Sequence, residues 1–420
     1  MNVPDNGARI TADLLVVGGG IAGMTAAIEA SEMGLEVVLV EKEPFLGGRV
    51  AQFNQYFPKM CPPWCGLEIN YRRLRGNDKV RILTLTTVDQ ASGGPGNCEA
   101  RLTIHPRYVN ENCTACGDCA QACPVDVPDE YNFGLSTRKA VYYRDMAFPP
   151  LYVVDPALAG DPRLQACRDA CKYEAVDLAM QPVTVTVQAK GIIWATGWQP
   201  YDANKLDTLG FGKFPNVVTN VMLERLASAG GPTEGKIRRP SDQGAIGKIA
   251  FVQCAGSRDA NHLPYCSGVC CAASIKQAQY VREQYPEAEI HLFYIDVRTP
   301  GRLEDFYAGA EKDAKIFFHR GKVGEIREAA NHNLIVAAEN TLTGKVTEME
   351  VEMAVLATGM VPNTAQERPP LDTPLDEWGF VGSSASGVTG AGVASRPADV
   401  AASVQQATGS VIQALLAQRR

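Results

Sequence analysis

The clearest chemical signal in the sequence is a run of four cysteines followed by a proline, CTACGDCAQACP. The spacing C-x2-C-x2-C-x3-C-P is that of bacterial iron–sulfur proteins, in which thiolates bind the irons of a cluster. A zinc knuckle is the alternative interpretation. The run, Cys113, Cys116, Cys119 and Cys123, predicts a [4Fe–4S] cluster in this segment.

A degenerate second half of this motif follows in DPRLQACRDACKYEAVDL. Cys167 and Cys171 keep the spacing of a third and fourth ligand. Asp161 and Leu164 stand where the first two ligands would be. In two-cluster ferredoxins the fourth cysteine of each run binds the other cluster. By that exchange, a second cluster has only Cys123 and Cys167, and the first is held by Cys113, Cys116, Cys119 and Cys171.

The two missing ligands leave alternatives open. In one hypothesis Cys61 and Cys65, from KMCPPWCGLE, complete the second cluster. In another they form a redox dithiol close to a flavin. If this region binds one cluster only, Cys123 is its fourth ligand and Cys171 is spare. The whole chain is therefore expected to hold two or three clusters.

A further group of cysteines lies in FVQCAGSRDANHLPYCSGVCC. Four thiolates can hold zinc or an iron–sulfur cluster, but adjacent cysteines are unusual in a zinc knuckle. A redox pair would leave two sulfurs without a role, and buried unreactive thiols are the remaining alternative. We predict a cluster site formed by Cys254, Cys266, Cys270 and Cys271.

The N-terminal segment DLLVVGGGIAGMTAAIEASEMGLEVVLVEKE predicts a strand, a glycine turn, a helix and a second strand. Gly18, Gly20 and Gly23 have GxGxxG spacing, which lets a pyrophosphate approach the backbone and the helix N-terminus. Glu41 ends the second strand, where a carboxylate accepts ribose hydroxyls. These features together predict a dinucleotide-binding site. The alternative is a glycine-rich turn that binds no ligand.

A second Rossmann-like unit is expected from residue 248. GKIAFVQ predicts a strand, residues 272–284 a helix, and EIHLFYID the following strand, which ends at Asp296. The turn between the first strand and the helix carries cysteines in place of the GxGxxG glycines. A pyridine-nucleotide cradle is therefore not expected in this unit.

Four further motifs resemble those of the two-dinucleotide-domain flavoproteins of the thioredoxin reductase class. GGRV, WATGW and LATGM resemble segments that approach the flavin in that class, and GVTGAGVASRPADV resembles its last glycine turn and helix start. Val393 replaces the usual aspartate, and Pro397 is placed to begin the helix. The resemblance implies FAD, with contacts at Gly48, Arg49, Gly197, Gly359 and Gly392.

The cysteine set of the second unit, with CAASIKQA, FYIDVRTPGRLEDFY and HRGKVGEI, resembles that of the heterodisulfide reductase A-subunit family. RVAQFNQYFPKMCPPWCGLEINYRRL and NHLPYCSGVCCAASIKQAQYVREQ narrow the resemblance to the A-subunit of the quinone-interacting membrane-bound oxidoreductase (Qmo) complex. The resemblance implies electron relay between menaquinone and adenylylsulfate reductase. The implied partners are adenylylsulfate reductase, a membrane haem subunit, plus a second flavin/iron–sulfur subunit.

The elements that position these motifs predict an α/β fold with two Rossmann-like domains and a ferredoxin-like insert. The FAD-binding domain is expected in three parts, 1–105, 181–247 and 352–420. The insert is expected at 106–180 and the second Rossmann-like domain at 248–351. A chain of 420 residues is long enough for these several cores.

Composition excludes some classes of partner. The net charge of −7 gives no electrostatic footprint for nucleic acid. No apolar run approaches the roughly 18 residues of a membrane span, and the N-terminus lacks the pattern of a secretory signal. We expect a cytoplasmic protein that meets the inner face of the cytoplasmic membrane only through partner subunits.

The expected activity is that of an oxidoreductase, with no catalytic nucleophile or general base in the sequence. Alternatives are a stand-alone FAD-dependent disulfide or thiol reductase, and a heterodisulfide reductase A-subunit with flavin-based electron bifurcation. A scaffold whose clusters only brace the fold is a further alternative.

Overall fold

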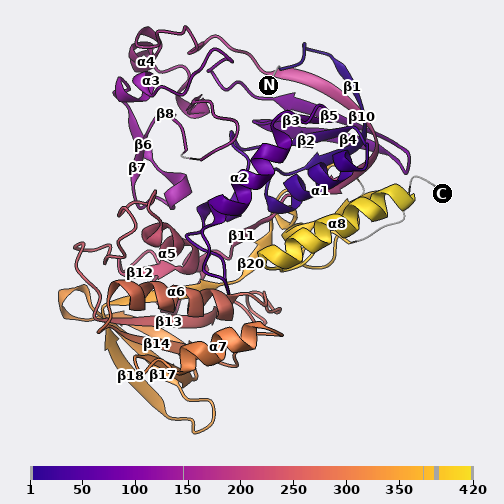
Figure 1. The fold of residues 1–420 in the computed structure, drawn as a ribbon. Helices are drawn as coiled ribbons and strands as arrows, with labels where there is room; N and C mark the ends of the chain where they lie inside the picture. The colour runs from indigo at the N-terminus through magenta and orange to yellow at the C-terminus, as the bar shows by residue number, and fades with distance from the viewer. Residues whose placement is uncertain (1–2, 145, 372, 383–386, 418–420) are drawn as a thin grey trace.

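The computed structural model describes residues 3–144, 146–371, 373–382 and 387–417 (Figure 1). Its first unit is a seven-stranded sheet in the order β3-β2-β1-β10-β5-β4, with β21 also beside β10. Strands β3, β2, β1, β10 and β21 are parallel, and β5 and β4 are antiparallel additions. The strands are β1 (Arg9–Val17), β2 (Val37–Val40), β3 (Val80–Leu83), β4 (Thr86–Gly94), β5 (Asn97–Ile104), β10 (Val183–Trp194) and β21 (Val388–Gly390).

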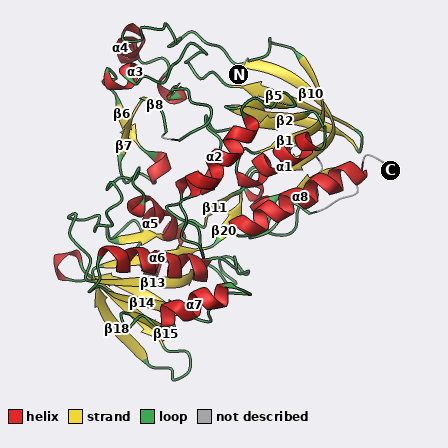
Figure 2. Cartoon of the chain, viewed as in Figure 1, coloured by secondary structure: helices red, strands yellow, loops and turns green. Residues whose placement is uncertain are grey.

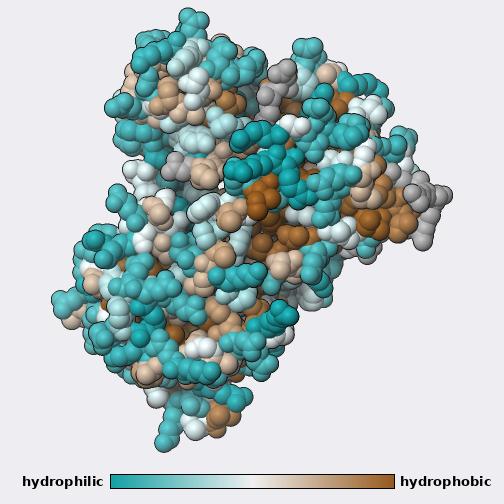
Figure 3. Space-filling model, viewed as in Figure 1, coloured by the Kyte–Doolittle hydropathy of each residue, from teal (hydrophilic) through white to brown (hydrophobic). Residues whose placement is uncertain are grey.

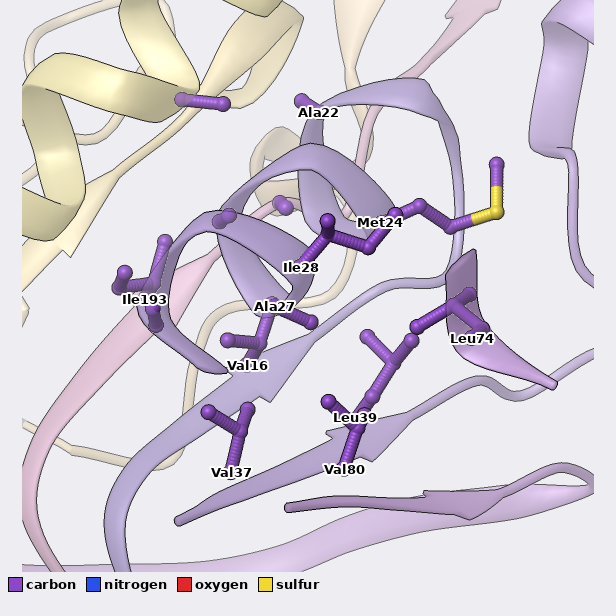
Figure 4. Packing of buried hydrophobic residues seen from close by; sticks show 14 of the residues in the cluster. Val16, Ala22, Met24, Ala27, Ile28, Val37, Leu39, Leu74, Val80 and Ile193 are labelled. Atoms are coloured by element: carbon purple, nitrogen blue, oxygen red, sulfur yellow. The ribbon is translucent and has the colours of Figure 1, made fainter. Parts of the chain in front are cut away.

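Three helices cover one face of this sheet because each turns an apolar stripe toward it. Their side chains share one core with the alternate, inward-facing residues of β1, β2 and β3, part of which Figure 4 shows. Every residue of β2 is buried, as expected for a parallel strand covered on both faces. The helices are α1 (Ile21–Glu32), α2 (Pro63–Leu74) and α8 (Val400–Ala417).

The second unit is a five-stranded parallel sheet in the order β12-β19-β13-β14-β15. An antiparallel sheet of three strands, β16, β17 and β18, packs beside it. The elements are β12 (Val217–Thr219), α5 (Asn220–Ala227), β13 (Lys248–Ala255), α6 (Cys270–Gln284), β14 (Glu289–Tyr294), α7 (Leu303–Glu311), β15 (Ile316–Arg320), β16 (Lys322–Glu328), β17 (Leu334–Glu339), β18 (Val346–Val351) and β19 (Met353–Thr358).

This pairing corrects the boundaries expected for the second unit. Strands β12 and β19 both lie outside 248–351, yet β19 pairs with β12 on one side and β13 on the other. The three-residue strand β12 is too short to give a hydrophobic pattern, so its pairing could not be inferred locally. The second sheet therefore draws on residues 217–358.

The insert leaves the first sheet at the end of β5 and returns at the start of β10. Ile104 pairs with Val183, so the two ends of the insert are adjacent, as required of an insertion into a strand pair. Most of the insert is loop (Figure 2) around its own small core. Its elements are α3 (Asp118–Gln121), β6 (Asp126–Pro128), β7 (Thr137–Lys139), β8 (Val141–Tyr142), β9 (Val153–Val154) and α4 (Gln165–Asp169).

The two large units are joined by an antiparallel strand pair, β11 (Trp198–Pro200) with β20 (Met360–Pro362). No helix in the described part of the chain is long and apolar enough to cross a bilayer. Most of the surface in Figure 3 is hydrophilic, and apolar side chains gather over the end of α8. Ile412 and Leu416 of that helix are 44% and 56% exposed.

Candidate functional site: a dinucleotide cradle and two cysteine sites

The first glycine motif forms the turn between β1 and α1. Gly18 has φ +112° and lies so close to the Ala195 carbonyl that a β-carbon would collide with it. A β-carbon at Gly23 would strike the Gly18 carbonyl, so this glycine lets the helix approach the strand. A β-carbon at Gly20 would meet the Gly48 α-carbon at an ordinary contact distance of 3.9 Å, and no side chain caps the helix that follows Gly20. Backbone amides are therefore free to meet a pyrophosphate.

Glu41 is buried directly behind this turn. Its carboxylate accepts hydrogen bonds from the backbone N–H of Gly19 at 2.6 Å and of Glu43 at 2.8 Å. Burial raises the pKa of Glu41 to about 7, and the two hydrogen bonds oppose that rise. The carboxylate stands at the strand end where Rossmann folds bind ribose, as the sequence predicted.

The GGRV segment packs against the glycine turn. Gly47 bridges to Gly20, and its N–H donates to the Gly19 carbonyl at 2.9 Å. The next residues form a short 3-10 helix (Gly48–Gln52). The Arg49 Nε donates to the Trp198 carbonyl at 3.1 Å, and the guanidinium lies 5.7 Å from the Phe133 ring centre. Burial lowers the pKa of Arg49.

The two ATG segments lie in different places. The first places Thr196 beside Gly18, and the Thr196 hydroxyl is buried without a partner among the described atoms. Gly197 follows directly, and its contact with a flavin stays a prediction. Gly359 instead follows β19 at the end of the second sheet. A β-carbon there would collide with Ser257 in the cysteine-containing connection between β13 and α6, which we call the cysteine loop. The contact of Gly359 with a flavin also stays a prediction.

Gly392 brings the last segment of the chain to the same cradle. It has φ +61°, and a β-carbon there would press on Ala22 in the first turn of α1. The final helix begins at Val400, three residues after Pro397, and the Asp399 carboxylate caps it by accepting from the N–H of Ala402 at 2.7 Å. FAD fits this arrangement of free amides, an unpaired hydroxyl and a buried carboxylate. Which residues contact the bound FAD stays a prediction.

Four cysteines of the insert surround one cavity, which also contains the tyrosines Tyr152 and Tyr173. The pKa of Cys119 is raised to about 12, first by burial and then by the neighbouring thiols of Cys113 and Cys171. Thiols with raised pKa values are neutral without metal, so a cluster would displace their protons on binding. The four cysteines that line the cavity are Cys113, Cys116, Cys119 and Cys171.

The structure thus groups Cys171, and not Cys123, with the first three cysteines of the run. Cys123 is 2% exposed and Cys167 is completely buried, and both pack in the core of the insert. Burial and the adjacent Cys123 thiol raise the pKa of Cys167 to about 12. The crossed ligand pattern of two-cluster ferredoxins is consistent with this grouping.

The four cysteines of the second unit also gather at one place, the N-terminus of α6. Cys270 and Cys271 are the first residues of that helix, and Cys254 lies near the end of β13 with φ +57°. The pKa of Cys254 is raised to about 11 by burial and by the thiols of Cys271 and Cys266. In a nucleotide-binding unit this helix N-terminus would hold the pyrophosphate.

A salt bridge beside these thiols was not anticipated from the sequence. The Arg258 guanidinium pairs with the Asp296 carboxylate and lies beside the Cys254 thiol, where it opposes the rise in the pKa of Cys254. Asp296 follows the second strand of this unit, at the position where Rossmann folds carry the ribose-binding acid. The second unit therefore keeps an acidic residue at this position, but the Asp296 carboxylate forms a salt bridge with Arg258.

The cysteine loop packs against the end of the first unit through one apolar group, which we call the junction cluster. Tyr265 and Val269 of the loop contact it, and the Tyr265 hydroxyl donates to the Met360 carbonyl at 2.8 Å. Val393, directly after Gly392, is one of its members. The junction cluster consists of Trp198, Val221, Met360, Phe380, Val393 and Ala398.

Cys61 and Cys65 are exposed, and neither lines the cavity of the insert. The preceding segment contacts the second unit: the Lys276 ammonium donates to the Gln55 carbonyl at 2.8 Å, and Met60 packs on the core of the second sheet. Cys98 is buried within β5. Ligation by Cys61 and Cys65 stays a hypothesis.

A buried ion pair across the same contact was missed from the sequence. The Lys276 ammonium lies 2.9 Å from the Glu224 carboxylate, and both side chains are 4% exposed. Glu224 also accepts from the backbone N–H of Asn54 at 2.9 Å. No hydrophobic or motif pattern marks either residue, because their charges are neutralised only by a partner distant in sequence.

Among the described residues, no group of three or more cysteine, histidine or acidic side chains is placed to hold a single metal ion. A cluster attaches each thiolate to a different iron, so its ligands stand farther apart than those of one ion. The chemistry of both sites, four thiols around one space, fits an iron–sulfur cluster; the ligand assignments stay predictions.

Comparison with known proteins gives three findings. Residues 13–68 match the family model of the FAD-dependent oxidoreductases. The chain is 38% identical, over 97% of its length, to the iron–sulfur A-subunit 2 of the CoB–CoM heterodisulfide reductase of Methanopyrus kandleri. It is 34% identical, over 98% of its length, to the A-subunit of the H2:CoB–CoM heterodisulfide,ferredoxin reductase of Methanothermobacter marburgensis. The chain spans 64% and 65% of the length of these two relatives.

The fold is similar to that of solved thioredoxin reductases. The enzyme of T. acidophilum superposes with a TM-score of 0.52 and 14% identity, covering 97% of both chains. That of Lactococcus lactis gives 0.53 and 15%, covering 97% of this chain and 99% of the other. The predicted pair of Rossmann-type units is thereby confirmed as a thioredoxin reductase-like fold.

Proposed function

Because the chain is a homologue of the A-subunits of heterodisulfide reductases, we propose that it is the flavin- and iron–sulfur-containing electron-transfer subunit of a larger oxidoreductase complex. That it is an oxidoreductase follows from the family model and the homologues. The assignment of FAD rests on the same family model. The clusters, their ligands and the partners are the proposed parts.

One observation carries the proposal: four thiols occupy the site where the second unit would otherwise hold a pyridine nucleotide. The N-terminus of α6 bears a positive partial charge, which stabilises an anionic cluster as it would a pyrophosphate. The loop that replaces the glycines is fixed by hydrogen bonds, including that of the Met360 N–H to the Ser267 hydroxyl at 2.8 Å. A rigid site of this kind suits an electron carrier, whose geometry should not change on reduction.

The junction cluster supplies the connection between the two redox sites. Through its buried apolar side chains, the cysteine loop contacts the segment after Gly392. FAD and the clusters, when bound, supply the exchange between two-electron and one-electron chemistry. The chain's own residues hold the sites close together, exclude solvent and set their electrostatic environment.

At the finer level, we propose membership of a Qmo-type complex in dissimilatory sulfur metabolism. Electrons would pass between the menaquinone pool and adenylylsulfate reductase, and the other partners would be a membrane haem subunit, plus a second flavin/iron–sulfur subunit. The cytoplasmic face of the membrane is the proposed location. The segment from Arg49 to Leu74 carries this part of the proposal through its resemblance to the corresponding segment of the Qmo family.

Metal analysis tests the second-unit site. Anaerobically purified protein with Cys254→Ser should lose about four irons per chain relative to wild type, at four irons per cluster. Cys98→Ser is the matched control, because Cys98 is a buried cysteine in β5 and lies outside both sites. Equal iron in the Cys254 variant and wild type would contradict the proposed site.

Reduction kinetics distinguish relay from a stand-alone reductase. The flavin of the intact complex should be reduced by a menaquinol analogue, and NADH should reduce it slowly or not at all because the second cradle is absent. Adenylylsulfate reductase added to the quinol-reduced complex should reoxidise it. Rapid reduction of the isolated chain by NADH would support a disulfide or thiol reductase instead.

A further inference from the structure

We propose that the insert binds one cluster only, through Cys113, Cys116, Cys119 and Cys171, and that Cys123 and Cys167 form a buried, metal-free thiol pair where a second cluster would be. This inference rests on the proposed function, in which the insert carries iron. It departs from the plain interpretation of the cysteine run, which makes Cys123 a ligand. It also removes the need for two further ligands from elsewhere in the chain.

The lining of the cavity divides the cysteines of the insert into two groups. The cavity of the insert is lined by four of them, and its edge reaches the surface because Cys116 is exposed. Cys123 and Cys167 do not line this cavity; like Cys119, they lie in the hydrophobic core with Val125 and Leu164. The two thiols are close enough for Cys123 to be a main influence on the pKa of Cys167. Ligands of one cluster bind different irons and need space for the cluster between them.

Leu164 and Asp161 stand at the two positions of the motif where cysteine ligands are missing. Leu164 is completely buried and belongs to the core of the insert. Asp161 caps the short helix that follows it by accepting from the Arg163 N–H at 2.9 Å. Both carboxylate oxygens also accept from the Arg163 guanidinium. Neither side chain is therefore available to an iron, and the apolar packing closes the site that two thiolates alone could not hold.

The outlying cysteines are not part of the core that holds Cys123 and Cys167. Cys61 and Cys65 lie at the start of α2, next to a segment whose Asn54 N–H and Gln55 carbonyl bond to α5 and α6. Both cysteines are exposed, whereas Cys123 and Cys167 are buried in the core of the insert, to which neither Cys61 nor Cys65 belongs. Among the described residues, a buried site between Cys123 and Cys167 is therefore not completed by these two thiols.

Iron counting on full-length protein, purified anaerobically, tests this proposal. Wild type should contain about eight irons per chain, from one cluster in each cysteine site. The double variant Cys123→Ala, Cys167→Ala should keep that number and the cluster EPR signals. Cys171→Ala should lose about four irons and one signal. Loss of iron from the double variant, or retention by the Cys171 variant, would overturn the proposal.

A second measurement keeps the test decisive if the double variant does not fold. Spin integration of reduced wild type should give two cluster spins per chain, and about twelve irons with three spins would overturn the one-cluster assignment without any variant. Wild-type protein free of iron would instead refute the proposed function. The two failures are therefore distinguishable.

Discussion

We expect the buried carboxylate of Glu41 to make FAD binding depend on pH near neutrality, where an ordinary glutamate stays ionised and does not titrate. Burial raises its pKa to about 7 from an ordinary value of 4.5. We expect the ionised form to bind FAD, because only a carboxylate accepts from both ribose hydroxyls while keeping its bonds to Gly19 and Glu43. The ionised fraction is high above pH 7 and falls below it, so FAD affinity weakens as the pH falls.

The magnitude follows from the titration of one group. With a pKa of about 7, the ionised fraction falls about tenfold between pH 8 and pH 6, so the Kd for FAD should rise by up to about tenfold. Glu41→Gln should remove this dependence. The variant should also bind FAD about 10- to 100-fold more weakly at pH 8, because an amide has one acceptor oxygen and a hydrogen bond to a charged group contributes about 1.5–3 kcal/mol.

Calorimetric titration of FAD into flavin-stripped protein at pH 6, 7 and 8 measures both effects. Glu36→Gln is the control, since Glu36 is an exposed acid at the other end of β2 and pairs only with Lys79 at the surface. The control should reproduce the wild-type pH profile. A Kd for wild type that is constant from pH 6 to pH 8, or tight binding by Glu41→Gln, would refute the reasoning.

Three further predictions concern other parts of the molecule. Lys276→Met should lower the free energy of unfolding by about 3–5 kcal/mol in urea denaturation, because it leaves the buried Glu224 carboxylate unpaired; a loss below about 1 kcal/mol would contradict this. Gly18→Ala should abolish FAD binding, measured as flavin content, because the added β-carbon collides with the Ala195 backbone at a φ of +112°. Normal flavin content in this variant would contradict the prediction by showing that the turn accommodates a β-carbon. Arg258→Gln should lower the midpoint potential of the adjacent cluster by about 40 mV, the equivalent of roughly 1 kcal/mol of lost attraction, in a redox titration followed by EPR. Asp296→Asn should shift that potential less, because it leaves the arginine charge in place, and an unchanged potential in the Arg258 variant would exclude electrostatic tuning.

Local patterns predicted most of the elements around the sites. The strand that ends before Gly18 and the helix after it form as expected, because glycine spacing and apolar periodicity act within a few residues. Helix α6 begins two residues before the expected start at Ala272, which places Cys270 and Cys271 in its first turn. The short strand β12 was missed because three residues carry too little pattern.

The sequence by itself identified the cysteines that are expected to carry the redox chemistry and showed that the second unit lacks the GxGxxG glycines, since both follow from residue type and short-range spacing. Only the tertiary structure decided between the two alternatives that the sequence left open, by placing Cys171 and not Cys123 at the cavity, and only it showed that the cysteine loop meets the segment after Gly392. These groupings join residues far apart in the chain. They are set by which apolar surfaces bury one another, and that choice is made only when the whole fold assembles.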